Sequence, residues 1–137
     1  QLGRAEAAAL AAAGPRLRVL GLPGCRLELP ALPLWAGCTR LERLDLSGAA
    51  GELAAHLRRL PASLRALDLS GPVTAHGFGA APLDDTAAAA LAASAAAAQL
   101  QSLFTAGCRG VSAGAGPALL QALPELSALD LEDAHIG

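Results

Sequence analysis

The sequence predicts an α/β fold built as a solenoid, with a parallel sheet of short strands on the concave side and helical or irregular segments on the convex side. Two observations predict this class. The motif L-x-x-L-x-L occurs five times, and its starts are separated by 24, 23, 36 and 26 residues. A period in the twenties gives each unit room for one strand and one returning segment. We therefore expect residues 1–137 to form a single domain, a horseshoe arc of about five repeats.

The strands are expected at the five motifs. These begin at Leu17, Leu41, Leu64, Leu100 and Leu126. Because successive strand residues face opposite sides, the fourth and sixth positions of each motif point into the core and the third and fifth face solvent. One short strand cannot bury its own Leu face, whereas stacked parallel strands covered by the returning segments can.

The returning segments are expected to be helical in most repeats. Residues 4–15 have the composition of a repeat helix, and residues 51–60 end just before a proline. Residues 84–99 open with Asp and Thr side chains that can cap a helix, and residues 117–124 begin with a proline suited to the first helical position. Residues 27–35 contain too much proline for a long helix, so we expect an extended or 3₁₀ segment there.

The third repeat exceeds its neighbours by about ten residues, and the surplus lies in an insertion loop at residues 71–85. This loop is rich in Gly and Pro and carries His76 and Phe78. Insertions of this kind lie on one face of a solenoid and often bind partners, although many are simply tolerated surface. We treat His76 and Phe78 as candidate partner-binding residues; a single His without a second ligand nearby does not make a metal site.

The three cysteines follow the repeat. Cys25 and Cys108 lie nine places into their repeats, in LPGC and TAGC, and Cys38 opens the stretch CTRLERLDLSG. With these motifs the chain resembles the cysteine-containing (F-box/RNI-like) leucine-rich-repeat family. The resemblance implies that each cysteine is a buried core thiol under the backbone of its repeat. No pair of cysteines has the spacing of a zinc site, so we expect no metal and no cofactor. Their odd number argues against a set of disulfides, so we expect an intracellular, reducing compartment.

Function is expected on the concave sheet. The candidate partner-binding residues there are Arg43, Asp45, Arg65, Asp68, Phe104 and Asp130. The fifth positions place several carboxylates in one row, which suggests a surface that binds Arg side chains of a partner. The alternative is that Leu-Asp-Leu-Ser is simply a common sequence for this motif. Phe104 has two interpretations. It is either an outward partner contact or, because Thr105 replaces an inward Leu, a core residue in a shifted register.

Composition and motifs exclude several classes of function. The formal net charge is -2 and the Arg residues alternate with carboxylates in stretches such as TRLERLDL, so we expect no basic face of the kind that holds a phosphate backbone and no nucleic acid partner. The longest apolar run is nearly all Ala and shorter than a bilayer span, so we expect no membrane insertion. No catalytic motif is present, and we expect no enzyme activity.

The leading hypothesis is a non-enzymatic scaffold for protein–protein interaction, a structural subunit or arm of a larger assembly. The sequence stops soon after the strand predicted at its fifth motif, so we expect further chain or another subunit to cover the open C-terminal end. The family resemblance implies one alternative, the substrate-recognition repeats of an F-box-type ubiquitin ligase receptor. A second alternative, a small repeat subunit of an organellar or ciliary complex, rests on fold analogy.

Overall fold

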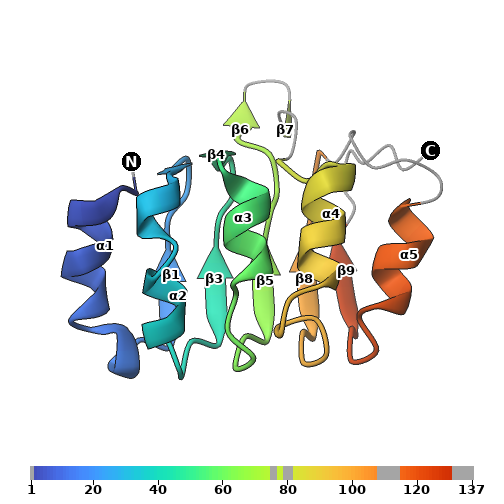
Figure 1. Cartoon of the computed structure of the whole chain (residues 1–137). Helices are drawn as coiled ribbons and strands as arrows, with labels where there is room; N and C mark the ends of the chain where they lie inside the picture. Colours follow the sequence, from blue (N-terminus) through green and yellow to red (C-terminus); the bar gives the residue numbers. More distant parts are fainter. Residues whose placement is uncertain (1, 75–76, 79–81, 108–114, 131–137) are drawn as a thin grey trace.

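The computed structural model describes residues 2–74, 77–78, 82–107 and 115–130 (Figure 1). Its helical elements are α1 (Arg4–Ala11), η1 (Gly14–Arg16), η2 (Leu29–Ala31), α2 (Leu34–Gly37), α3 (Leu53–Arg58), α4 (Asp85–Ala92) and α5 (Ala115–Gln121), of which η1 and η2 are 3₁₀ turns. The strands are β1 (Val19–Gly21), β2 (Arg26–Leu27), β3 (Arg43–Asp45), β4 (Ala50–Gly51), β5 (Ala66–Asp68), β6 (Val73–Thr74), β7 (Gly77–Phe78), β8 (Ser102–Phe104) and β9 (Ala128–Asp130).

The predicted α/β class and its parallel sheet are confirmed. Five three-residue strands form one sheet in the order β1-β3-β5-β8-β9, and every neighbouring pair is parallel. The helices lie in a row across one face of this sheet, and each passes its chain to the next strand along (Figure 1). The predicted alignment of the motifs is confirmed too, because the fifth positions pair in one unbroken row: Gly21, Asp45, Asp68, Phe104 and Asp130.

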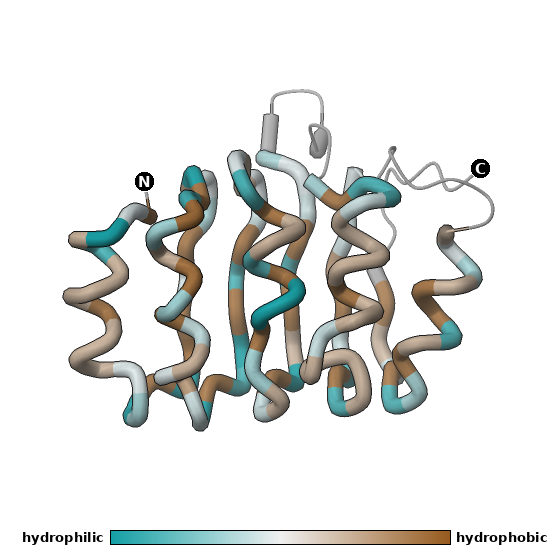
Figure 2. Tube along the Cα trace, in the orientation of Figure 1, coloured by the Kyte–Doolittle hydropathy of each residue, from teal (hydrophilic) through white to brown (hydrophobic). Residues whose placement is uncertain are grey.

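The core lies between the sheet and the row of helices. The central Leu of β1, β3, β5 and β8 is buried against the helices, and Leu44, Leu67 and Leu103 are at most 3% exposed, whereas Leu129 in the end strand β9 is 38% exposed. Figure 2 shows hydrophobic residues along the strands and hydrophilic residues gathered at the turns. The first-position Leu is fully buried in the three central repeats but only half-buried at Leu17 and Leu126, since the end repeats have fewer neighbours among the described residues.

Several helices differ in extent from their predicted ranges. The helix expected over residues 84–99 ends at Ala92, and the hydroxyl of Ser94 donates to the Leu91 carbonyl where turns take over. The helix expected from Pro117 begins at Ala115 instead. Proline is tolerated at its third position because the first four N–H groups of a helix have no intrahelical acceptor.

The first returning segment contains the expected 3₁₀ turn, η2, followed by the one-turn helix α2. Beyond the main sheet, β2 and β4 form a small parallel pair that the sequence did not predict. Gly51 in β4 has φ +86°, and a Cβ there would collide with the Leu27 carbonyl oxygen, so this close approach requires glycine. Within the insertion loop β6 and β7 pair antiparallel.

Candidate functional site

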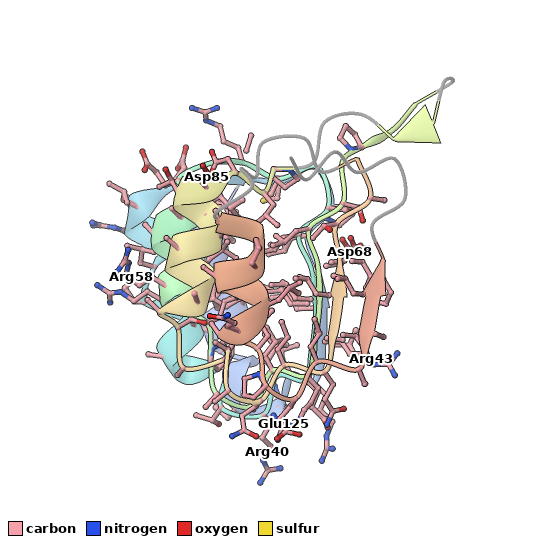
Figure 3. The ribbon with its side chains drawn as sticks, turned by 90° about the vertical axis from the view of Figure 1, so that its right-hand side faces the viewer. Arg40, Arg43, Arg58, Asp68, Asp85 and Glu125 are labelled. Carbon is pink, nitrogen blue, oxygen red and sulfur yellow. The ribbon has the colours of Figure 1, made fainter. Side chains whose placement is uncertain are left out.

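The sheet face turned away from the helices carries most of the predicted site. We call it the outer sheet face and define it by the third- and fifth-position residues of β1, β3, β5 and β8. These are Val19, Gly21, Arg43, Asp45, Ala66, Asp68, Ser102 and Phe104. Figure 3 shows Arg43 and Asp68 on this side of the sheet and Arg58 and Asp85 on the helix side. Val19 is 65% exposed, so an apolar side chain lies open to solvent at one end of this face.

A shallow hollow of about 330 Å³ extends across the outer sheet face from β1 to β8. Its floor is the strand backbone, and Val19, Arg43, Asp45, Asp68 and Phe104 are among the side chains that line it. The hollow therefore brings together an aliphatic group, an aromatic ring, a guanidinium group and two carboxylates. Such a mixture can bind a protein surface through apolar contact and charge pairing at once.

The two carboxylates have a structural role that the sequence did not reveal. Asp45 Oδ1 accepts the Ser47 N–H at 2.8 Å, and Asp68 Oδ1 accepts the Ser70 N–H at 2.9 Å. Both are turns in which an Asp side chain accepts a backbone N–H two residues on, and they end the strands. The Asp of the Leu-Asp-Leu-Ser motif is thus explained locally, whereas these bonds use only the backbone of the Ser. Each half-buried Asp still has a second carboxylate oxygen outside this hydrogen bond.

The structure decides between the two interpretations of Phe104. Phe104 pairs with Asp68 in the common register, and Leu103 beside it is buried. Thr105 is 1% exposed and takes the inward place of the missing Leu. The register is therefore not shifted, and Phe104 stays on the outer sheet face as a half-buried ring.

The structure separates the two predicted arginines. Arg43 is exposed at the third position of β3 on the outer sheet face. The placement of Arg65 on this face is wrong, because Ala66 is the residue that pairs with Arg43. Arg65 precedes β5, and its Nη1 donates to the carbonyl oxygens of Ala62 and Ser63 at 3.2 and 3.1 Å. It belongs to the edge of the sheet where the strands begin.

Other predicted residues are described only in part. The backbone of Asp130 completes the fifth-position row in β9 and that of Phe78 lies in β7, but their side chains lie outside the described part of the structure. His76, Cys108 and the C-terminal end at residues 131–137 also lie outside the described residues.

The expectation of a buried thiol at each cysteine holds for Cys38 but only in part for Cys25. Cys38 is 0% exposed, and burial raises the pKa of its thiol. Cys25 is half-buried against the core, with its Sγ 3.8 Å from the Arg26 carbonyl oxygen. Both thiols are free. In the parts of the chain that the structure describes, no group of three or more His, Cys, Asp or Glu residues could hold a metal ion.

Sequence reasoning missed a buried polar cluster between α2 and α3. Trp35 Nε1 donates to His56 Nδ1 at 2.9 Å, so His56 carries its proton on Nε2 and donates it to the Glu28 carbonyl oxygen at 2.8 Å. The Trp35 and His56 rings meet edge to face. Burial lowers the pKa of His56, although its bond to the Glu28 carbonyl and the charge of Glu52 act in the opposite direction. The only signal in the sequence was that a buried Trp N–H needs an acceptor.

The remaining observations concern the whole chain. Among the described helices, none has both the length and the apolar composition needed to cross a membrane. Comparison of the chain with protein-family models and with curated proteins finds no match.

Proposed function

We propose that the protein is a leucine-rich-repeat solenoid and a non-enzymatic scaffold for protein–protein interaction, serving as a structural subunit or arm of a larger assembly. The five motifs and their common strand register support the repeat architecture. The free thiols of Cys25 and Cys38 support an intracellular, reducing location. The partner surface in this proposal is the outer sheet face.

One observation carries the proposal: the hollow on the outer sheet face combines an exposed Val19, an exposed Arg43 and the ring of Phe104. Aromatic residues and Arg are enriched at the centres of protein interfaces, because they bury a large area and still make directional polar contacts. Asp45 and Asp68 lie beside each other in register, so their second oxygens can receive a basic group of the partner.

The shape of the hollow favours a protein over a small molecule. Sites for small ligands are concave enough to bury most of the ligand's surface. Here the floor is a sheet of short strands, and the lining residues extend over four neighbouring strands from Val19 to Phe104. An open, extended surface of this kind is suited to a protein segment laid across the strands.

Affinity purification of the full chain from its source, followed by quantitative mass spectrometry, tests this proposal. The wild-type chain is compared with an outer-face variant, Val19→Ala with Phe104→Ala. A matched control, Leu29→Ala with Leu120→Ala, truncates two apolar residues that are 51% and 45% exposed and lie away from this face. All three are first shown to fold alike by circular dichroism.

We expect a defined set of proteins to be enriched with the wild-type chain, retained by the control variant and lost with the outer-face variant. Loss of about tenfold or more is reasonable for two side chains at the centre of an interface. If the outer-face variant and the control retain the same proteins equally well, this face is not the binding surface and the proposal is wrong.

A further inference from the structure

Folding separates charges that the sequence interleaves. Acidic residues gather where strands end and helices begin. The described members of this acidic end are Glu6, Glu28, Asp45, Glu52, Asp68, Asp84 and Asp85. Figure 3 shows Asp85 toward the top of the molecule, Asp68 near mid-height above Arg43, and Arg40 at the bottom beside Glu125. The separation is incomplete, since Glu42 and Glu125 lie at the opposite edge and Arg4 and Arg26 lie at the acidic end. The linear order, in which Arg residues alternate with carboxylates, therefore conceals which residues share an edge.

We define the basic edge as the arginines at the start of β1, β3 and β5. They are Arg16, Arg18, Arg40, Arg43 and Arg65. Val19 pairs with Arg43, and the same offset places Arg16 beside Arg40. Arg18 and Glu42, which are also 24 residues apart, are joined directly, since the Arg18 carbonyl accepts the Glu42 N–H at 2.8 Å. The turns before them are in contact as well, with Gly14 against the Gly37 carbonyl.

Two members of the basic edge have partners within the chain. Arg18 pairs with Glu42 at 3.4 Å, and the two side chains are 66% and 49% exposed, respectively. Arg65 donates to backbone carbonyl groups of the turn before it. Among the described residues, Arg16, Arg40 and Arg43 are exposed and have no carboxylate within salt-bridge distance. Exposed cations along one edge without an internal counterion form a positive surface open to a ligand.

The two charged ends differ in how far local structure explains them. At the acidic end Asp45 and Asp68 close turns, and Asp84 caps α4 by accepting the Ala87 N–H at 2.8 Å. Acidic residues are also favoured near helix N-termini. Within the described part of the chain, Arg16 and Arg40 have no corresponding role in local structure, since one ends a three-residue 3₁₀ turn and the other lies in the turn before β3.

We propose that the basic edge binds an acidic segment of a protein partner, with Arg16 and Arg40 as its central contacts. Planar guanidinium groups pair with carboxylates through two parallel hydrogen bonds, and a row of them matches a run of Asp or Glu residues. The proposal rests on the proposed function as a protein-binding scaffold. It adds a second surface and the chemistry of the segment that this surface selects.

The observations favour an acidic protein segment over nucleic acid. The basic edge spans three neighbouring strands, roughly 10 Å, which is short for tracking a phosphate backbone. It offers no aromatic platform among its own residues for stacking bases.

Fluorescence anisotropy with a labelled octaglutamate peptide tests this assignment on the full chain at low salt. We expect saturable binding that weakens steeply as the ionic strength rises to about 0.3 M, because exposed charges are then screened. Arg16→Glu with Arg40→Glu is expected to weaken binding by about tenfold or more. Arg16→Lys with Arg40→Lys keeps the charge but loses the paired hydrogen bonds, so it is expected to weaken binding by a smaller factor, about threefold.

The matched control is Arg4→Glu with Arg26→Glu, which makes the same charge change at the acidic end, where both arginines are exposed. It is expected to alter binding by no more than about threefold. An equal loss of binding in this control would show that the peptide responds to net charge alone, and it would overturn the proposal. Tighter binding of a labelled octauridylate, or salt-sensitive self-association in sedimentation, would overturn it in favour of nucleic acid or a second copy. The outer-face variants leave Arg16 and Arg40 intact, so the two proposals can fail separately.

Discussion

Replacing His56 with Phe tests the polar cluster that joins α2, α3 and the segment around Glu28. His56 is 0% exposed, accepts the Trp35 indole N–H at 2.9 Å and donates to the Glu28 carbonyl oxygen at 2.8 Å. Phe has a ring of similar shape but neither accepts nor donates these bonds. The variant therefore removes two buried hydrogen bonds and creates little empty volume.

The expected cost follows from what each partner loses. The indole N–H of Trp35 is left buried without an acceptor, which costs about 1–3 kcal/mol. The Glu28 carbonyl keeps a second bond, from the Ala31 N–H at 3.1 Å, so its loss is limited. An ordinary hydrogen bond contributes about 1 kcal/mol, and we expect His56→Phe to lower the free energy of unfolding by about 2–4 kcal/mol. That is a large fraction of the total stability of a domain of this size.

Urea unfolding followed by far-ultraviolet circular dichroism measures this loss in the wild-type chain, His56→Phe, Trp35→Phe and the double variant. Removing the indole N–H also removes the unsatisfied donor, so the double variant is less destabilised than the sum of the single variants. We expect a coupling free energy of about 1–2 kcal/mol. A loss below about 0.5 kcal/mol in His56→Phe, or additive single variants, would show that the cluster does not stabilise the fold as argued.

Three further predictions test other parts of the structure. Because burial is the main cause that lowers the pKa of His56 in the folded chain, its contribution to stability is complete above the unfolded-state pKa of about 6.5 and declines as the pH falls below it. The urea midpoint of the wild-type chain should therefore drop more between neutral and mildly acidic pH than that of His56→Phe. Gly51→Ala should lower the free energy of unfolding by at least about 3 kcal/mol, since the new Cβ would meet the Leu27 carbonyl oxygen. Gly24→Ala should lower it by only about 1 kcal/mol, because only the positive φ opposes a side chain there. Equal urea midpoints of the two variants would contradict this. Ser70→Ala should lower the free energy of unfolding by about 1–2 kcal/mol in the same assay, since the buried Ser70 hydroxyl accepts the Ala106 N–H. An unchanged urea midpoint would show that this hydrogen bond contributes nothing to stability.

The strand register was predictable from the sequence because the motif repeats and side chains alternate with a period of two. That alternation also predicted the row from Asp45 to Phe104, which the structure confirms. The helix ends were not predictable in the Ala-rich segment, since Ala is accepted both in the core and at the surface. Within α4, Ala87 is buried while Ala89 is exposed, and nothing in their identity distinguishes them.

The contacts between repeats explain why the basic edge was missed. In the sequence Arg16 and Arg40 each stand near other charges, and the stretch TRLERLDL suggests a neutral mixture. In the structure, neighbours on the sheet edge are residues one repeat apart, because parallel strands place equal motif positions side by side. Charge must therefore be compared between equal positions of successive repeats. At the position before the motif this comparison gives Arg16, Arg40, Ser63, Gln99 and Glu125, a gradient from basic to acidic along the sheet edge. A partner whose charges complement this gradient binds in one direction only, with its acidic segment over β1 and β3. This fixed direction distinguishes the proposed contact from attraction to net charge alone.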